Sequence, residues 1–351
     1  MELYIYNPSI EQLGVIDSFS SLRWRRRFFE PGEFELHCPA TADNLALLAE
    51  GNIIARLDRC EAGVIEGMTV ESTDESGDEL TVTGRMGSSL LDRRIIIPAI
   101  SFTGSTETAM RKIVSDNAIA ARPIPGLILG TPGNFTSACS FQAAYKGVLE
   151  TLEALGKAAP LGFRLRLDVP NKAWIFEAYE GADKTITQTE RPYVLFSDGF
   201  GNISGPKYTL DSTGCCNFAY VGGEEKDGTR TFITVDRTNG EPQRELWVDA
   251  KDLKKGELSD ADYQAQLTQR GLEKLSGTGK AESFEASAVN TTNFQYRSDW
   301  DLGDIVSFEK WGLRLDQRIT EVEETYEGGV ETVTPTCGTP LPEKLNLGDD
   351  T

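Results

Sequence analysis

The sequence predicts a mostly β protein with an α+β insert, in which two similar small β-barrels flank an α+β module. Short alternating runs fill residues 1–97, mixed helical and strand spacing fills 98–190, and alternating runs return, around one inserted helix, in 191–340. Two segments near opposite ends of the chain also share one pattern of strands and turns. We therefore expect a first β-barrel domain, the α+β module, a second β-barrel domain and a polar tail at 341–351.

The first β-barrel domain is predicted from a series of strand patterns. The run "GEFELHCPA" (32–40) alternates apolar and polar residues, as a half-buried strand does, and "NIIARL" (52–57) and "GVIEGMTVEST" (63–73) follow it. The charged turn "DESGD" (74–78) then leads into "ELTVTGR" (79–85). Gly and Asp punctuation between two such runs indicates a β-hairpin.

The α+β module is predicted from two helices and two strands. Ser105 is a suitable N-cap for the first helix, and a second helix is expected over 141–156 with Gly156 as its stop. The strands are "FRLRLDV" (163–169) and "KAWIFEAYE" (172–180), joined by a Pro-Asn turn. The inward residues of the two helices are Met110, Ile113, Val114 and Ala118, and Tyr145, Val148, Leu149, Leu152 and Leu155.

One helix interrupts the second β-region. Ser259 and Asp262 form a variant of the capping box in which Asp replaces Glu or Gln. The helix is expected to run to about residue 275, with Gly271 as a weak point. Its inward residues are Tyr263, Leu267 and Leu275.

An internal repeat links the two β-regions. The segment "GNIIAR" (51–56) aligns with "GDIVSF" (303–308), and residues 68–87 align without gaps with residues 319–338 after a shift of one residue. Each copy reads as a strand, a connector, a strand, an acidic Gly turn and a closing strand. Hairpins share Thr, Val and Gly for propensity reasons alone, so coincidence is the alternative. The common strand order favours two similar β-barrels.

The composition indicates a folded protein with an acidic surface. Apolar residues make up 39% of the 351 residues, charged residues 26%, and 55 acidic against 35 basic residues give a net charge of −20. Such a surface repels nucleic-acid phosphate, so sequence-specific binding of nucleic acid is not expected. The N-terminus has no basic region of a signal peptide, and no apolar run approaches the roughly 20 residues that a membrane span needs.

The cysteines predict no disulfide framework. None forms a CxxC pair, and scattered cysteines in a long chain are typical of a reduced protein made in the cytosol. We interpret them as small buried apolar side chains. They are Cys38, Cys60, Cys139, Cys215, Cys216 and Cys337.

Catalytic and metal-binding signatures are weak, and we predict no catalytic, cofactor-binding or metal-binding residue. The single histidine, His37, lies on the polar side of its strand, which favours a solvated histidine over a catalytic base. No GxSxG, HExxH or P-loop sequence is present. The Gly-rich stretches 126–135 and 197–205 are interpreted as turns, because Asp198 and Asn202 alone fall short of the ligands that calcium requires.

The stretch "LRWRRRFFEPG" (22–32) interleaves arginines with aromatic residues, as nucleic-acid-binding proteins do. In a strand, however, alternate residues face opposite sides. In so acidic a chain, we favour a subunit contact carried by these arginines. One face would carry Trp24, Arg26 and Phe28, and the other Arg23, Arg25, Arg27 and Phe29.

These segments together resemble the hub proteins of tailed-phage tails, especially the siphophage tail-tip (baseplate) hub family, related in fold to the tail hub proteins of contractile phages. The resemblance begins with "SLRWRRRFFEPGEFELHCPA" (21–40) and continues through "GNIIAR", "GVIEGMTVES" and "DELTVTGRMGSSLLDRR". It includes "GNISGPKYTLDSTGCCNFAYVGGEE" (201–225) and "RELWVDAKDL" (244–253), and ends with "LGDIV", "RITEVEETYE" and "VTPTCG" near the C-terminus. It covers nearly the whole chain.

The resemblance implies a structural protein of the virion tail, made in the cytoplasm of the bacterial host, and not an enzyme. Such hubs are homotrimers in which two similar barrels per protomer give a pseudo-six-fold ring. The ring docks on a hexameric tail tube or distal tail protein, presents three-fold symmetry to a tail fibre, spike or tape measure protein, and lets DNA pass. Family members often carry a longer C-terminal extension with endopeptidase or host-binding activity, which this chain is not expected to supply.

Two alternatives remain. A tail-associated cell-wall hydrolase needs acids that converge in a cleft, such as Asp198 with Asp211. A host carbohydrate-binding β module needs no such acids and is recognised by saturable binding of a glycan.

Overall fold

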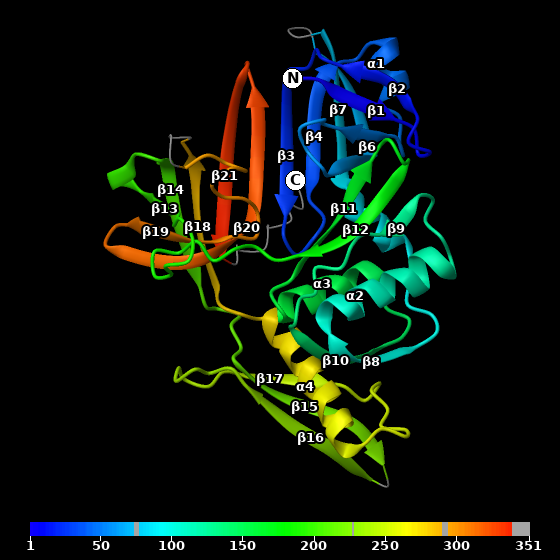
Figure 1. Ribbon diagram of the computed structural model, residues 1–351, viewed down its shortest axis with the longest axis vertical. Helices are drawn as coiled ribbons and strands as arrows, with labels where there is room; N and C mark the ends of the chain where they lie inside the picture. The colour runs from blue at the N-terminus through cyan, green and yellow to red at the C-terminus, as the bar shows by residue number, and fades with distance from the viewer. Residues whose placement is uncertain (74–76, 227, 290–293, 339–351) are drawn as a thin grey trace, which may run out of the picture.

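The computed structural model describes residues 1–73, 77–226, 228–289 and 294–338. The protein is mostly β, with four α-helices in the described part of the chain. A long sheet runs through the upper half of the view in Figure 1, the helices of the central module lie below it, and a small helix-and-sheet insert forms the lower end. The polar tail expected at 341–351 lies outside the described residues.

The first β-unit is defined here as the strands β3, β4, β7, β6, β5, β1 and β2, in their order of pairing. Its strands alternate buried and more exposed residues as expected. In β4, Phe34, Leu36 and Cys38 are all buried, and the residues between them are not. The elements are β1 (Leu3–Tyr6), β2 (Gln12–Ile16), β3 (Ser21–Arg27), β4 (Glu33–Pro39), α1 (Ala42–Leu47), β5 (Ile53–Ala55), β6 (Ala62–Thr73), β7 (Gly77–Met86) and a 3-10 helix η1 (Gly87–Arg93).

The α+β module follows and shares a core with the first β-unit. Apolar residues of β5 and β6, among them Ile53 and Val64, pack in one cluster with the helices and strands of the module. The elements are β8 (Ile100–Ser105), α2 (Thr106–Val114), a π-helical turn η2 (Ser115–Ala120), β9 (Leu127–Leu129), β10 (Ala138–Ala143), α3 (Val148–Ala158), β11 (Gly162–Asp168) and β12 (Ala173–Tyr179).

The predicted cap of α2 is confirmed, whereas the predicted start of α3 is wrong. The Ser105 hydroxyl accepts a hydrogen bond from the Thr108 backbone N–H at 3.2 Å. Residues 141–143, however, belong to β10, which pairs with β8, and Tyr145 is exposed with a φ of 58°. That left-handed conformation cannot continue a helix, so α3 begins at Val148.

A carboxyl group on α3 makes the module sensitive to pH. Burial, and then the neighbouring Glu30, raises the pKa of Glu153 from 4.5 to about 7. The folded state therefore binds this proton more tightly than the unfolded state, and stability falls as pH rises from about 4.5 to about 7.

We expect Glu153→Gln to remove this dependence and to raise the free energy of unfolding at pH 8 by about 1–2 kcal/mol, after a discount for solvent screening. Urea denaturation at pH 5 and pH 8 measures the effect. Glu150→Gln, at an exposed position of the same helix, is the control and should change the curves far less, because Glu150 is the smallest of the charges that raise the pKa of Glu153. An equal gain at both pH values would contradict the assignment.

The second β-unit is defined as the strands β14, β18, β21, β20, β19 and β13, in their order of pairing. Its core holds Phe196, Phe284, Trp300 and Phe308, which meet in a run of ring contacts. The elements are β13 (Leu195–Ser197), a 3-10 helix η3 (Asp198–Phe200), β14 (Ile203–Asp211), β18 (Ala281–Ala288), β19 (Ile305–Lys310), β20 (Leu313–Glu327) and β21 (Val330–Gly338).

The inserted helix does not stand alone, because it packs on a three-stranded sheet with a core of its own. The elements of this insert are β15 (Phe218–Lys226), β16 (Thr229–Asp236), β17 (Glu245–Asp249) and α4 (Asp260–Ser276). The Ser259 N-cap is confirmed, since its hydroxyl accepts the Asp262 N–H at 3.1 Å, and it donates to the Asp262 carboxylate at 2.7 Å where a full capping box would use the Ser259 backbone N–H. Tyr263, Leu267 and Leu275 are buried as expected.

Gly271 is a point of close approach between α4 and the sheet beneath it. A Cβ added there would lie 2.6 Å from a methyl group of Val235 and 2.9 Å from one of Val221. We expect Gly271→Ala to lower the free energy of unfolding by about 1–2 kcal/mol, because overpacking outweighs the gain of about 1 kcal/mol in helix propensity. Thermal unfolding measures it, with exposed Gln264→Ala as the near-neutral control. A stabilised Gly271→Ala protein would contradict the close packing.

The internal repeat is present in the structure as one pattern of backbone hydrogen bonds. In the first β-unit the Gly51 N–H donates to the Ile65 carbonyl at 2.9 Å, and the Ile65 N–H donates to the Asn52 carbonyl at 2.9 Å. In the second β-unit the corresponding bonds join Gly303, Asp304 and Ile319, at 2.9 and 2.8 Å. A β-bulge follows Ile65 in β6 and Ile319 in β20.

The two β-units also correspond strand by strand. Each contains a row of directly paired residues across four strands, namely β3, β4, β7 and β6 in the first and β14, β18, β21 and β20 in the second. The first row is Trp24, Phe34, Gly84 and Ile65, and the matching row is Tyr208, Phe284, Cys337 and Ile319.

The gapless alignment of the second block is nevertheless wrong by two to three residues. It places Met68 on Ile319, whereas the structure places Ile65 there. The shared Thr and Val residues therefore reflect strand propensity and not register. Among the described residues no strand pairing closes either β-unit on itself, so the two closed barrels stay a prediction.

Candidate functional site: the junction of the two β-units

The two β-units join edge to edge through β3 and β20. The strands pair antiparallel over seven residue pairs, from Arg27 opposite Glu321 to Ser21 opposite Glu327. Segments about 300 residues apart in the sequence thus lie side by side, which Figure 1 shows as blue and orange strands at the centre of the sheet. The junction makes one continuous sheet out of two repeats.

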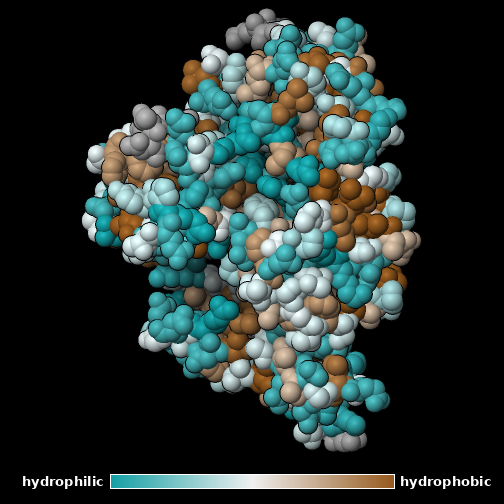
Figure 2. Space-filling view, in the orientation of Figure 1, coloured by the Kyte–Doolittle hydropathy of each residue, from teal (hydrophilic) through white to brown (hydrophobic). Residues whose placement is uncertain are grey.

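One face of the junction carries a ladder of opposite charges. Arg25 lies between Glu323 and Glu33, at 2.6 and 2.7 Å, and Arg27 donates to Glu321 at 2.9 Å. Burial alone would raise the pKa of Glu323, but hydrogen bonds from Arg25 and Arg23 outweigh burial and lower it. In the view of Figure 2, hydrophilic side chains gather where the two β-units meet.

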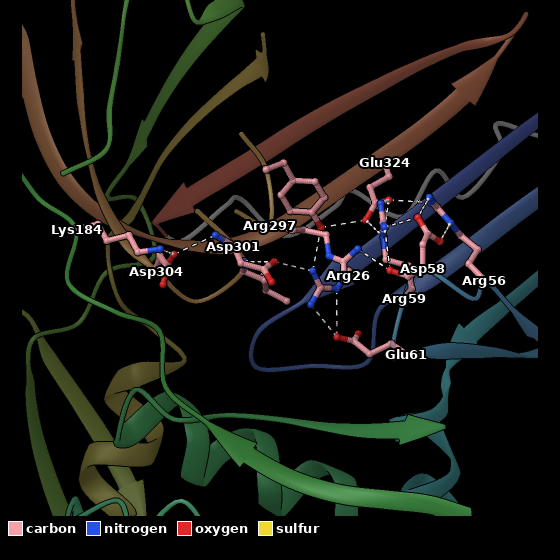
Figure 3. Close-up of polar contacts among 12 residues, drawn as sticks. Arg26, Arg56, Asp58, Arg59, Glu61, Lys184, Arg297, Asp301, Asp304 and Glu324 are labelled. Atoms are coloured by element: carbon pink, nitrogen blue, oxygen red, sulfur yellow. Dashed lines mark hydrogen bonds and ion pairs between the residues drawn. The ribbon is translucent and has the colours of Figure 1, made fainter. Parts of the chain in front are cut away.

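The opposite face buries an ion network, drawn in Figure 3. Arg26, on β3, is 4% exposed and contacts Glu61 at 3.0 Å and Asp301 at 2.8 Å. Its guanidinium also donates to the Tyr296 hydroxyl at 2.9 Å. Burial would lower the pKa of Arg26, but Glu61 and its other partners raise the pKa well above the usual value. Arg26 is therefore a fixed cation between the two β-units.

Glu324, on β20, is the buried anion of the same network. Its carboxylate, on a residue 2% exposed, accepts hydrogen bonds from Arg56 at 2.8 Å, from Arg59, and from the Tyr296 hydroxyl at 2.9 Å. The two arginines lie in the connection between β5 and β6 of the first β-unit, and Glu324 lies in the second β-unit. Asp58 holds both arginines from the other side, at 3.0 and 2.5 Å. A buried carboxylate is stable only with such partners.

Phe28, directly after β3, carries the first β-unit into the core of the second. Its N–H donates to the Thr320 carbonyl at 2.9 Å, and its ring is fully buried in the cluster of the second β-unit. It meets the Tyr179 ring edge-on at a centroid distance of 5.1 Å. Gly162 and Gly303 allow this, because a Cβ at either position would lie 2.5 or 2.6 Å from the Phe28 ring.

The predicted alternation of β3 is confirmed, whereas the subunit contact expected of its arginines stays a prediction. Trp24, Arg26 and Phe28 are buried, and Arg25 and Arg27 lie on the other face. These arginines take their carboxylate partners from within the chain. Sequence reasoning missed Glu324, Arg56 and Arg59, although the acidic alternation of β20 opposite an arginine strand was a signal.

The other residues considered from the sequence are not brought together. His37 contacts Glu35 at 3.0 Å and Thr81 at 3.2 Å on the polar face of β4. The side chain of Asn202 bonds the backbone of Ser197 and Leu195 at 2.9 Å each, and Asp198 pairs with Lys310, so both are used in holding a turn. Asp198 lies in the turn before β14 and Asp211 is the last residue of β14, a strand that spans roughly 25 Å when extended.

The cysteines are free within the described residues. Cys38, Cys139 and Cys337 are buried as interpreted, and burial raises the pKa of the first two thiols to about 11. Cys60, Cys215 and Cys216 are only half-buried. Of the helices in the described ranges, none combines the length and the apolar character needed to cross a membrane.

A feature that sequence reasoning missed is an aromatic surface on the insert. Tyr220, Phe232 and Trp247 project from three adjacent strands and are 38%, 58% and 52% exposed. Phe232 and Trp247 are in ring contact at 5.7 Å, and the Arg230 guanidinium lies 5.2 Å from the Trp247 ring. The alternation of β16 was the available signal, since it places Phe232 on the face opposite buried Val235.

Comparisons with known structures identify the fold. The chain is similar to the 43 kDa tail protein of prophage MuSo2 from Shewanella oneidensis, at 15% identity and a TM-score of 0.61, over 97% of this chain and 99% of that one. It is similar to a tail protein from Neisseria meningitidis MC58, at 12% identity and a TM-score of 0.60, over 96% and 95% of the two chains. It is also similar to prophage tail protein gp18 from Listeria monocytogenes EGD-e, at 13% identity and a TM-score of 0.58, over 96% and 94%.

At sequence level, the comparison with curated proteins gave no match. A family model described as Siphovirus ReqiPepy6 Gp37-like protein, in contrast, matches residues 2–339. The chain therefore belongs to the Siphovirus ReqiPepy6 Gp37-like family and has the fold of phage tail proteins.

Proposed function

We propose that the protein is a structural hub of the tail tip or baseplate of a phage or phage-derived particle. Three copies form a ring whose six β-units imitate six-fold symmetry. One side of the ring docks on the hexameric tail tube or distal tail protein, and the other presents three-fold symmetry to a fibre, spike or tape measure protein. The hub has no catalytic role of its own.

The observation that carries this proposal is the β3–β20 junction between two β-units of common strand order and register. A chain that repeats one unit head to tail already contains one of the contacts that a six-unit ring requires. Three chains then supply six units with three-fold symmetry. The similarity of fold to phage tail proteins supports the same setting.

The acidic surplus has a place in such a ring. With a net charge of −20, carboxylates lining the lumen repel the phosphates of passing DNA and prevent the DNA from sticking. A structure of the assembled ring with a basic lumen and the surplus on the outer rim would contradict this role.

Light scattering and negative-stain imaging of the purified chain, alone and with its distal tail protein, test the ring. The expected result is a particle of three copies, with a central hole in projection. A mass of one copy at high concentration and with the partner present would overturn the proposal.

A second candidate function, binding of a host carbohydrate, is favoured by the exposed aromatic surface of the insert. Tyr220, Phe232 and Trp247 offer flat apolar faces of the kind on which sugar rings stack. A glycan array separates the two candidates. Saturable binding of a glycan that Trp247→Ala abolishes supports a receptor role. The absence of glycan binding supports the hub function alone. The hydrolase alternative has no comparable support, since Asp198 precedes β14 and pairs with Lys310, whereas Asp211 ends that strand.

A further inference from the structure

We propose that neighbouring copies in the ring join by pairing β14 of one copy with the outer half of β6 of the next, antiparallel and in the register of β3 with β20. This inference rests on the proposed ring and specifies its contact. The partner is a second copy of this chain.

Both strands have an open edge in the described part of the chain. β14 ends the sheet, with β18 as its one neighbour. β5 covers only residues 62–64 of β6, so the segment 67–73 pairs on one side alone, with β7. Figure 1 shows β14 and β6 on opposite sides of the molecule. An unpaired edge exposes a row of backbone donors and acceptors that favours addition of another strand.

The repeat shows that these two edges are the counterparts of the two strands at the internal junction. The bulges and paired rows place β6 on β20 and β14 on β3. The segment 321–327 of β20 pairs with β3, and its counterpart in β6 is the open segment 67–73. Two unlike edges that fit each other produce head-to-tail association, which closes into a ring or continues as a filament.

The register follows from the correspondence and brings exposed apolar residues together. Arg26 lies opposite Val322 at the internal junction, so their counterparts Leu210 and Met68 lie opposite each other between copies. Likewise Tyr208 lies opposite Val70. Met68 and Val70 are each 49% exposed and Leu210 is 50% exposed, whereas Val322 at the junction is fully buried.

These side chains lie on the face that covers the cores. Met68 and Val70 are paired across β7 with Val82 and Leu80, which are fully buried in the core of the first β-unit. Tyr208 is paired with Phe284 in the core of the second β-unit. The contact between copies therefore extends both cores across the boundary, as Trp24 and Val322 do within the chain.

The opposite face carries a complementary charge pair. In the same register Glu71 lies opposite Lys207, which in the single copy contacts Glu285 at 3.3 Å. Lys207 would then lie between two carboxylates, as Arg25 lies between Glu323 and Glu33. Pro206 lacks an N–H and ends the ladder, which leaves five pairs, 67–71 with 207–211.

Charge exchange tests this contact. We expect Glu71→Lys to lower the association constant of the trimer about tenfold, because the new lysine lies opposite Lys207 of the neighbouring copy at each of the three contacts. Adding Lys207→Glu should recover part of the lost assembly, because it restores an opposite-charge pair between copies but sets a carboxylate beside Glu285 within each copy. Sedimentation velocity measures the trimer fraction, and circular dichroism verifies that each single copy remains folded.

Cross-linking tests the register. Met68→Cys with Leu210→Cys puts the two cysteines directly opposite each other between copies, with Cα atoms about 5 Å apart, which is within the range of a disulfide. Oxidation should give covalent dimers and trimers. Thr69→Cys with Leu210→Cys is the control, because Thr69 faces the opposite side of its strand, and should give none above the level of the wild type.

The outcomes separate the contact from the ring. A wild-type trimer that ignores Glu71→Lys and yields no Met68–Leu210 cross-link overturns this contact and leaves the hub function standing. A wild type that forms no trimer with its partners overturns both.

Discussion

Glu324→Gln should lower the free energy of unfolding by about 3–5 kcal/mol, the cost of breaking a buried ion network by removing one charge. The substitution keeps the shape of the side chain but leaves Arg56 and Arg59 without their shared carboxylate. The NH₂ of the new amide also faces the guanidinium donors with two N–H donors of its own. Urea denaturation followed by tryptophan fluorescence reports the change directly, because Trp24 lies opposite Glu324 on β3.

Glu323→Gln is the matched control. Glu323 is the preceding residue, on the outer face of the same strand, and its side chain is 23% exposed and paired with Arg25 and Arg23. A solvent-accessible pair contributes little, so we expect a loss of about 1 kcal/mol or less. Equal losses at the two positions would contradict the distinct role of the buried network.

A double-mutant cycle isolates the interaction across the junction. Arg56→Met removes one of the two cations that Glu324 holds, and alone it should also destabilise the protein. In combination with Glu324→Gln the loss should be smaller than the sum of the two single losses by at least about 1 kcal/mol. Additive losses would show that the two residues act independently.

The features that sequence could predict are those fixed by neighbours along the chain. The N-caps at Ser105 and Ser259 each need only a hydroxyl and a backbone N–H three residues later. The alternation of apolar and polar residues in β3 and β4 requires only that one side of the sheet faces a core, because successive side chains of a strand point to opposite sides. Strand order in the repeat was also visible, because each copy contains the same sequence of strands and turns.

The features that sequence could not predict depend on contacts between distant segments. The junction joins residues about 300 positions apart, and nothing local specifies that β20 continues the sheet at β3. Tyr145 has helical neighbours, yet pairing of β10 with β8 removes residues 141–143 from the helix. In the insert, the strand patterns were present, but their separation from the second β-unit follows from a core that forms only in three dimensions.

Phe28 is an apolar residue through which the two β-units are joined. Its ring comes from the end of β3 and fills the core of the second β-unit beside Tyr179, between Gly162 and Gly303. The backbone glycines cannot move inward to fill the space, so truncation leaves a cavity. We expect Phe28→Ala to lower the free energy of unfolding by about 3–5 kcal/mol, and Phe28→Leu by roughly a third of that amount.

The adjacent Phe29 is the control, because it is only partly buried at the margin of the same cluster. Phe29→Ala should cost about half as much or less, since less apolar surface is lost and no enclosed cavity forms. Hydrogen exchange separates a local effect from a general one: with Phe28→Ala, amides of β20 that pair with β3 should exchange faster than those of α4 in the insert. Uniformly faster exchange, or equal losses for the two phenylalanines, would mean that Phe28 does not hold the two β-units together.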